Sequence, residues 1–130
     1  MPKSPGQVVD DHYAAAARGD LDGMFADFAP DIAWTEMTGS PFVGTYIGPD
    51  AIKKNVFHRI GGEWEGYQAV PEHILREGNE VVAFGLYTGV FRATSKPISA
   101  RFVHHWVIAD GKVVGFEQYT DTRLFADAMS

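Results

Sequence analysis

Residues 102–122, FVHHWVIADGKVVGFEQYTDT, carry side chains that could do acid–base chemistry within a stretch that otherwise favours β-strands. Asp110-Gly111 is a typical two-residue hairpin turn between apolar segments. The polar residues around it are two histidines, a glutamate, a tyrosine and an aspartate, which can donate, accept or shuttle protons. Their positions on the two strands decide whether they can act together.

The register of this hairpin follows from its turn. A two-residue turn pairs residue 109 with residue 112, and His104 then lies opposite Glu117. Side chains alternate between the faces of a strand, so the residues two and four positions further along share that face. The predicted face carries His104, Glu117, Tyr119 and Asp121 among Phe102, Trp106 and Ile108.

Polar groups set among aromatic walls favour a small-molecule pocket, because the walls give affinity and the polar groups give orientation. Burial would also raise the pKa of a carboxyl group there and make it an acid or base near neutral pH. A structural alternative is that His104 and Glu117 form a satisfied cross-strand pair and that Asp121 only caps the strand end. A loop one residue longer would reverse the two faces.

The opposite face of the same hairpin is predicted to be apolar. It would carry Val103, Val107, Val114 and Phe116, with Arg101 also pointing outward. An exposed apolar patch of this kind is typical of a contact surface. We therefore expect a homodimer that forms through the outer face of the sheet.

The elements that must position these residues follow an α+β order, with helices first and strands dominating the second half. The periodicity predicts helices over 5–18 and 21–28, and a third that opens at Gly48-Pro49-Asp50. Residues 61–66, GGEWEG, are predicted to be a loop. The predicted strands are 31–37, 42–47, 67–76, 80–92, a strand from about residue 97, and 113–120. Three helices on one face of a mostly antiparallel sheet is the simplest assembly.

Composition narrows the class of protein. The 130 residues fit a single domain, 1–130, and the net charge of −6 disfavours nucleic acid or an anionic membrane as partner. The absence of cysteine excludes thiolate chemistry, and the sequence has neither a metal-binding motif nor a Gly-rich cofactor loop. We therefore expect no metal and no cofactor. Without a secretory leader or a membrane-spanning run, a cytoplasmic location is expected.

Three segments resemble a known family in the order in which they occur. GDLDGMFADFAPDIAWTE, PFVGTYIGPDAIKKNVF and ARFVHHWVIADGKVVGFEQYTDT resemble the SnoaL-like polyketide cyclases, which belong with the ketosteroid isomerases to the NTF2-like superfamily. The resemblance covers about residues 8–124. It implies a cone, in which a strongly curved sheet wraps around the helices and a pocket opens between its concave face and the first and third helices. It also implies a dimer and no cofactor.

The resemblance suggests residues for proton transfer. Glu36 falls at the position of the catalytic base of the isomerases, and His12, with Tyr13 beside it, falls at the position of their oxyanion-binding tyrosine. His104 falls at the position of their acidic oxyanion donor, and Asp121 is the nearest match to the acid–base aspartate of the cyclases. A histidine in place of that acid makes steroid isomerisation itself doubtful.

The function expected is proton abstraction and return on a small, largely apolar carbonyl compound. Glu36 or Asp121 would be the base, and His104 and His12, together with Tyr119, would stabilise the oxyanion. The residues expected to form the walls are Trp34, Phe57, Phe102 and Trp106. Two alternatives remain open at this stage: a non-catalytic carrier or sensor with the same pocket, and a dimerisation module with a filled interior.

Overall fold

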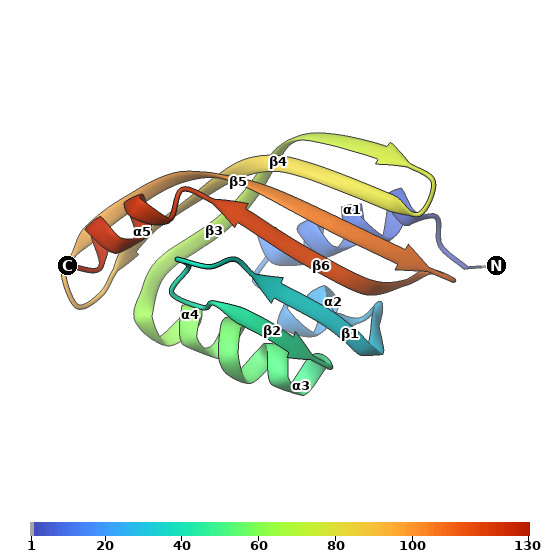
Figure 1. Cartoon of the computed structure of the whole chain (residues 1–130), viewed down its shortest axis with the longest axis horizontal. Coiled ribbons are helices and arrows are strands. Elements are labelled where there is room, and N and C mark those ends of the chain that lie inside the picture. Colours follow the sequence, from blue (N-terminus) through green and yellow to red (C-terminus); the bar gives the residue numbers. More distant parts are fainter. Residues whose placement is uncertain (1) are drawn as a thin grey trace.

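The fold is a curved six-stranded sheet with helices on its inner side, and it confirms the α+β prediction (Figure 1). The computed structural model describes residues 2–130. The strands are β1 (Phe28–Glu36), β2 (Gly44–Ile47), β3 (Trp64–Glu77), β4 (Glu80–Phe91), β5 (Lys96–Ala109) and β6 (Lys112–Thr120). Their order in the sheet is β2-β1-β6-β5-β4-β3, and every neighbouring pair is antiparallel except β1 and β6. The sheet does not close into a barrel.

The first two helices, α1 (Pro5–Ala17) and α2 (Leu21–Phe25), begin at side-chain caps. Ser4 accepts a hydrogen bond from the backbone N–H of Gln7, and Asp20 accepts one from the backbone N–H of Gly23. The apolar stripe of α1 packs on β3, β4 and β5. This packing presents His12 and Tyr13 to the interior.

The third helix has three consecutive pieces: α3 (Pro49–Ile52), the π-helical segment η1 (Lys53–Phe57) and α4 (His58–Glu63). The prediction of a loop over 61–66 was wrong, because α4 continues to Glu63 and β3 begins at Trp64. An ion pair and a buried side chain stabilise this junction. Arg59 forms an i,i+4 ion pair with Glu63, and the Trp64 side chain is only 1% exposed.

The β5–β6 hairpin has the predicted turn but not the predicted register. Asp110 and Gly111 both have positive φ, and Ala109 pairs with Lys112. A bulge then follows, since Ile108 pairs with Val113 but Val107 pairs with Gly115. The extra residue reverses the two faces of β6 beyond it. Trp106 therefore pairs with Phe116, His104 with Gln118, and His105 with Glu117.

A fifth helix, α5 (Thr122–Ala128), was not predicted. Asp121 caps it by accepting a hydrogen bond from the backbone N–H of Arg123. Its buried Phe125 packs against Trp64 and Tyr87 at one end of the sheet's inner side. Within residues 2–130, no helix has the length and the apolar character that crossing a membrane would require.

Candidate functional site

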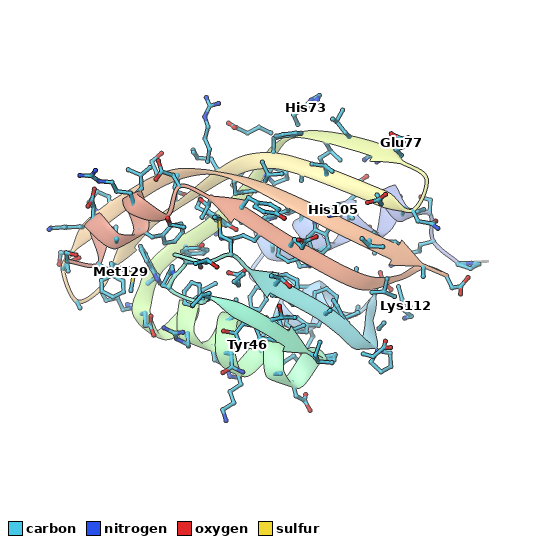
Figure 2. All side chains as sticks on the ribbon, in the orientation of Figure 1. Tyr46, His73, Glu77, His105, Lys112 and Met129 are labelled. Carbon is cyan, nitrogen blue, oxygen red and sulfur yellow. The ribbon has the colours of Figure 1, made fainter. Side chains whose placement is uncertain are left out.

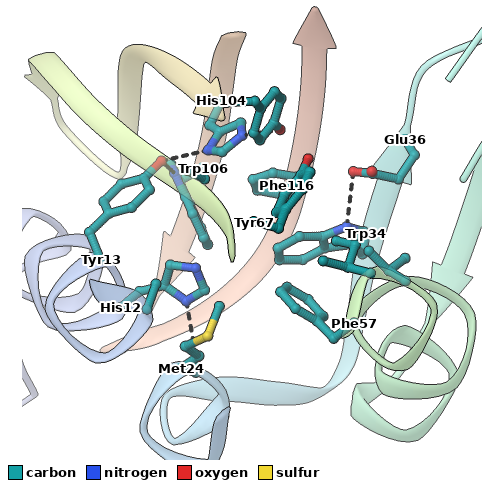
Figure 3. Close-up of a pocket in the computed structure, with 15 residues that line it drawn as sticks. His12, Tyr13, Met24, Trp34, Glu36, Phe57, Tyr67, His104, Trp106 and Phe116 are labelled. Carbon is teal, nitrogen blue, oxygen red and sulfur yellow. Dashed lines mark hydrogen bonds between the residues drawn. The ribbon is translucent and has the colours of Figure 1, made fainter. Parts of the chain in front are cut away.

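A cavity lies between the inner face of the sheet and the helices (Figure 3). Its volume is about 60 Å³, measured as the space that can take the centre of a water molecule. Its polar lining consists of His12, Tyr13, Glu36, Tyr67, Tyr87 and His104. Its larger apolar lining includes Met24, Trp34, Val56, Phe57, Ile60, Trp106 and Phe116. Such a lining suits a small, mostly apolar ligand.

Glu36 stands at the end of β1, on the same face of the strand as Trp34. Its side chain is buried, and the Trp34 indole Nε1–H donates to Oε2 over 3.2 Å. Burial raises the pKa of Glu36 to about 8, because the single indole hydrogen bond only partly compensates the lost hydration. The group is thus mostly protonated at neutral pH and can exchange a proton in that range.

His104 lies between two tyrosines on the far side of the cavity from Glu36 (Figure 3). The Tyr13 hydroxyl is 2.6 Å from Nδ1, and the Tyr87 hydroxyl is 2.6 Å from Nε2. Burial, with His12 nearby, lowers the pKa of His104 well below its usual range, so the ring is neutral. We call Tyr13, His104 and Tyr87 the tyrosine–histidine chain.

A neutral imidazole has one N–H and one lone pair, so one tyrosine donates to His104 and the other accepts from it. The accepting tyrosine keeps its own O–H for another acceptor. Trp106 adds a fixed donor, since its Nε1–H lies 3.1 Å from the Tyr13 oxygen. Burial raises the pKa of both Tyr13 and Tyr87, which keeps them protonated. One of the two tyrosines therefore keeps a phenol proton that the imidazole of His104 does not use.

His12 has a fixed tautomer that leaves an acceptor, whereas the tyrosine–histidine chain leaves a donor. Its Nδ1 lies 3.0 Å from the Met24 carbonyl oxygen, which can only accept, so Nδ1 carries the proton and Nε2 carries the lone pair. Burial lowers the pKa of His12 to about 4. At neutral pH His12 thus presents an acceptor, and not a donor for an oxyanion.

The structure brings together seven of the residues that the sequence singled out. Those that line the cavity are His12, Tyr13, Trp34, Glu36, Phe57, His104 and Trp106. Phe102 is buried but lies behind His104, with the two rings stacked at 3.8 Å, and it does not line the cavity.

The remaining three candidates lie outside the cavity. Glu117 and Tyr119 are on the outer face of the sheet, where the Tyr119 hydroxyl donates to Glu117 Oε2 over 2.9 Å. The prediction that placed them beside His104 was wrong because the bulge in β6 reverses their direction. Asp121 is exposed and caps the start of α5, a helix that was not predicted, and not only the end of a strand as the structural alternative had it.

The sequence analysis missed several lining residues, above all Tyr67, Tyr87 and Phe116. Tyr87 could have been found from the alternation in β4, where Val81, Ala83 and Tyr87 share the buried face. Phe116 was assigned to the wrong face, together with the other residues of β6 beyond the bulge. Among residues 2–130, no cluster of three or more His, Asp or Glu side chains could hold a metal ion.

Comparison with known proteins identifies relatives of the whole fold. An NTF2-like protein from Burkholderia thailandensis is 47% identical, with a TM-score of 0.96 and 98% of each chain covered. TerC, co-crystallised with polyporic acid, is 26% identical, with a TM-score of 0.85 over 96% of this chain and 97% of TerC. A protein from Xanthomonas campestris assigned as a polyketide cyclase is 20% identical, with a TM-score of 0.83 over 97% of this chain and 96% of its own. No curated protein matched the chain. The model of the SnoaL-like domain family matches residues 9–116, and the chain belongs to this family.

Proposed function

We propose that this chain is an enzyme that abstracts and returns a proton on a small, largely apolar carbonyl compound. The observation that carries the proposal is the arrangement of the cavity. Glu36 and the tyrosine–histidine chain line the same aromatic cavity, and Figure 3 shows Glu36 across it from Tyr13 and His104. A base and a hydrogen-bond donor placed in this way can act on two atoms of one ligand.

In the proposed reaction the Glu36 carboxylate removes a proton from the carbon next to the carbonyl. The C–H electron pair moves into the enolate, and the carbonyl oxygen accepts a hydrogen bond from Tyr13 or Tyr87. Protonated Glu36 then returns the proton to carbon, either at the same position or at a conjugated one. His104 acts as a positioning residue in this scheme, because both of its nitrogens are occupied by the tyrosines.

The pKa of about 8 for Glu36 supports this role, because a base is most effective when its pKa lies near the operating pH. An ordinary exposed glutamate would be ionised at neutral pH but would be a weaker base by several pKa units. The relationship to TerC, which was co-crystallised with the small molecule polyporic acid, supports a small-molecule ligand for the pocket.

The test is deuterium uptake from D2O into a panel of aromatic and alicyclic ketones, followed by NMR or mass spectrometry. We expect wild type to accelerate exchange and Glu36→Gln to slow it by at least about a hundredfold. Glu117→Gln is a matched control, since Glu117 lies on the outer face of the sheet. Asp121→Asn tests the second carboxylate, and it should leave exchange unchanged because an asparagine still caps α5.

A second candidate is a carrier or sensor that binds the same class of ligand without chemistry. The protonated state of Glu36 at neutral pH favours it, since a neutral carboxyl group can simply donate a hydrogen bond to a ligand. Ligand binding with no exchange in wild type at any pH up to about 9 would support this candidate over the enzyme.

A further inference from the structure

The polar groups that border the cavity are unequal in what they offer a ligand. Only one of Tyr13 and Tyr87 keeps a free O–H, since the other donates to His104, and protonated Glu36 is a donor that already accepts from Trp34. His12 Nε2 is different, because the bond from Nδ1 to the Met24 carbonyl leaves it as a fixed lone pair. Figure 3 shows this nitrogen turned toward the middle of the cavity.

No side chain within residues 2–130 donates to Nε2 of His12. His12 is 6% exposed, and the aromatic rings around it belong to Tyr13, Phe28, Trp34 and Trp106, none of which is hydrogen-bonded to Nε2. The indole N–H groups of Trp106 and Trp34 already donate to Tyr13 and to Glu36. A buried acceptor left without a donor destabilises the complex when a ligand displaces the water that serves it.

We infer that the cavity selects a hydroxylated carbonyl compound whose hydroxyl group donates to Nε2 of His12. The carbonyl group of this ligand is inferred from the proposed function, and its hydroxyl group is inferred from His12 alone. A ligand with a carbonyl group only would accept from the free tyrosine O–H and leave Nε2 of His12 unpaired. His12 is then a specificity-determining residue and not a base, because a group with a pKa of about 4 is a poor proton acceptor at neutral pH.

The test compares pairs of ligands that differ in one proton donor. Hydroxyacetophenones and their methoxy counterparts, with the substituent at each ring position, are titrated into the protein near neutral pH while tryptophan fluorescence and ligand NMR are followed. Trp34 and Trp106 line the cavity and can report binding. For at least one position we expect the hydroxy compound to bind about ten- to a hundredfold more tightly than its methoxy counterpart.

Two variants assign that preference to His12. His12→Phe keeps an aromatic ring but removes the acceptor, and it should abolish the preference; His12→Gln, whose amide oxygen can accept, should restore part of it. In wild type labelled with ¹⁵N, the Nε2 signal of His12 should be that of an unprotonated nitrogen and should move when the hydroxy compound is added. This signal needs no variant, so the inference stays testable if a variant unfolds.

Equal binding of the hydroxy and methoxy compounds, a preference that persists in His12→Phe, or failure of every hydroxy compound to bind would each overturn the inference. Deuterium exchange is measured separately from binding. A hydroxyl preference without exchange would contradict the proposed enzyme and keep the inference. Exchange without a hydroxyl preference would support the proposed enzyme and overturn the inference about His12.

Discussion

Glu36 illustrates how burial alone can prepare a residue for chemistry. Its position at the end of β1 follows from the same alternation that buries Trp34. Trp34 is the single side-chain donor to its carboxyl group among residues 2–130, so the charged form is poorly stabilised. The cost of ionising Glu36 in the folded protein should therefore be visible in the pH dependence of stability.

The first prediction concerns that pH dependence. The pKa of Glu36 is about 8 in the folded protein against an ordinary value of 4.5, so the folded state retains a proton that the unfolded state releases. The free energy of unfolding should therefore fall by roughly 1.4 kcal/mol per pH unit as the pH rises between the unfolded and the folded pKa of Glu36, and it should level off above the folded pKa. Above pH 6.5, the ordinary pKa of histidine, His12 and His104 are mainly neutral in both the folded and the unfolded state and add little to the slope.

Urea unfolding between about pH 7 and 8 measures this slope. Glu36→Gln, which can still accept from Trp34, should flatten it and should be more stable than wild type at the upper end. A wild-type slope that the variant leaves unchanged would mean that another group titrates.

The second prediction concerns the phenol donors at the same scale. Tyr13→Phe and Tyr87→Phe should each slow ketone exchange by about ten- to a thousandfold, because each removes a phenol that can donate to the enolate. The double variant should lose less exchange rate than the two single losses combined would predict, since the two tyrosines share one imidazole. Tyr119→Phe is the matched control on the outer face, and it should catalyse ketone exchange at the wild-type rate. Full activity in both single variants would remove the tyrosine–histidine chain from the mechanism.

At the scale of elements, one bulge explains most of the difference between the predicted and the observed site. The turn residues Asp110-Gly111 were identifiable because they require positive φ. The extra residue at Val114 was not, because nothing in a run of valines and glycine marks where the ladder shifts. Residues before the bulge, such as His104 and Trp106, were placed correctly, and residues after it, such as Glu117 and Tyr119, were not.

The third prediction tests this register by stability. Phe116 is 3% exposed and stacks on Trp34 at 3.7 Å, whereas Val114 is partly exposed on the other face. Phe116→Ala should lower the free energy of unfolding by about 3 to 5 kcal/mol, and Val114→Ala by less than about 1.5 kcal/mol. Urea titrations of the two variants give the comparison. A small loss from Phe116→Ala, similar to that from Val114→Ala, would favour the register without a bulge, in which both residues lie on the outer face.

The whole molecule was predictable as far as its family and its layers are concerned. The α+β order and the resemblance to SnoaL-like proteins led to a curved sheet around helices, and the structure confirms it. The parallel pairing of β1 with β6 and the helix α5 depend on contacts between distant segments, which local periodicity does not report. The cavity depends on these contacts too, because its side chains come from α1, α2, η1, α4 and five strands.

The outer face of the sheet is the surface on which the expected homodimer depends. The helices α1 to α4 lie on the other side (Figure 1), while side chains project from both faces of the sheet (Figure 2). Large apolar side chains remain exposed over β3, β4 and β6, namely Val70, Leu75, Phe84 and Tyr119, at 38% to 53%. They surround partly buried residues of β5, including Val103 and Val107. Exposed apolar side chains gathered in this way are unfavourable in water unless they are covered.

The fourth prediction is that a second copy of the chain covers this face. Sedimentation velocity should give the mass of a dimer for wild type, and Phe84→Glu should shift it toward the 14.3 kDa monomer, because the substitution places a charge in the middle of the apolar surface. Leu124→Glu is the control, since Leu124 is equally exposed, at 39% against 38% for Phe84, but lies on α5. A monomeric wild type would assign the face to a different partner. A dimer that survives Phe84→Glu and dissociates with Leu124→Glu would place the interface at α5 instead, at the end of the sheet where Phe125 packs against Trp64.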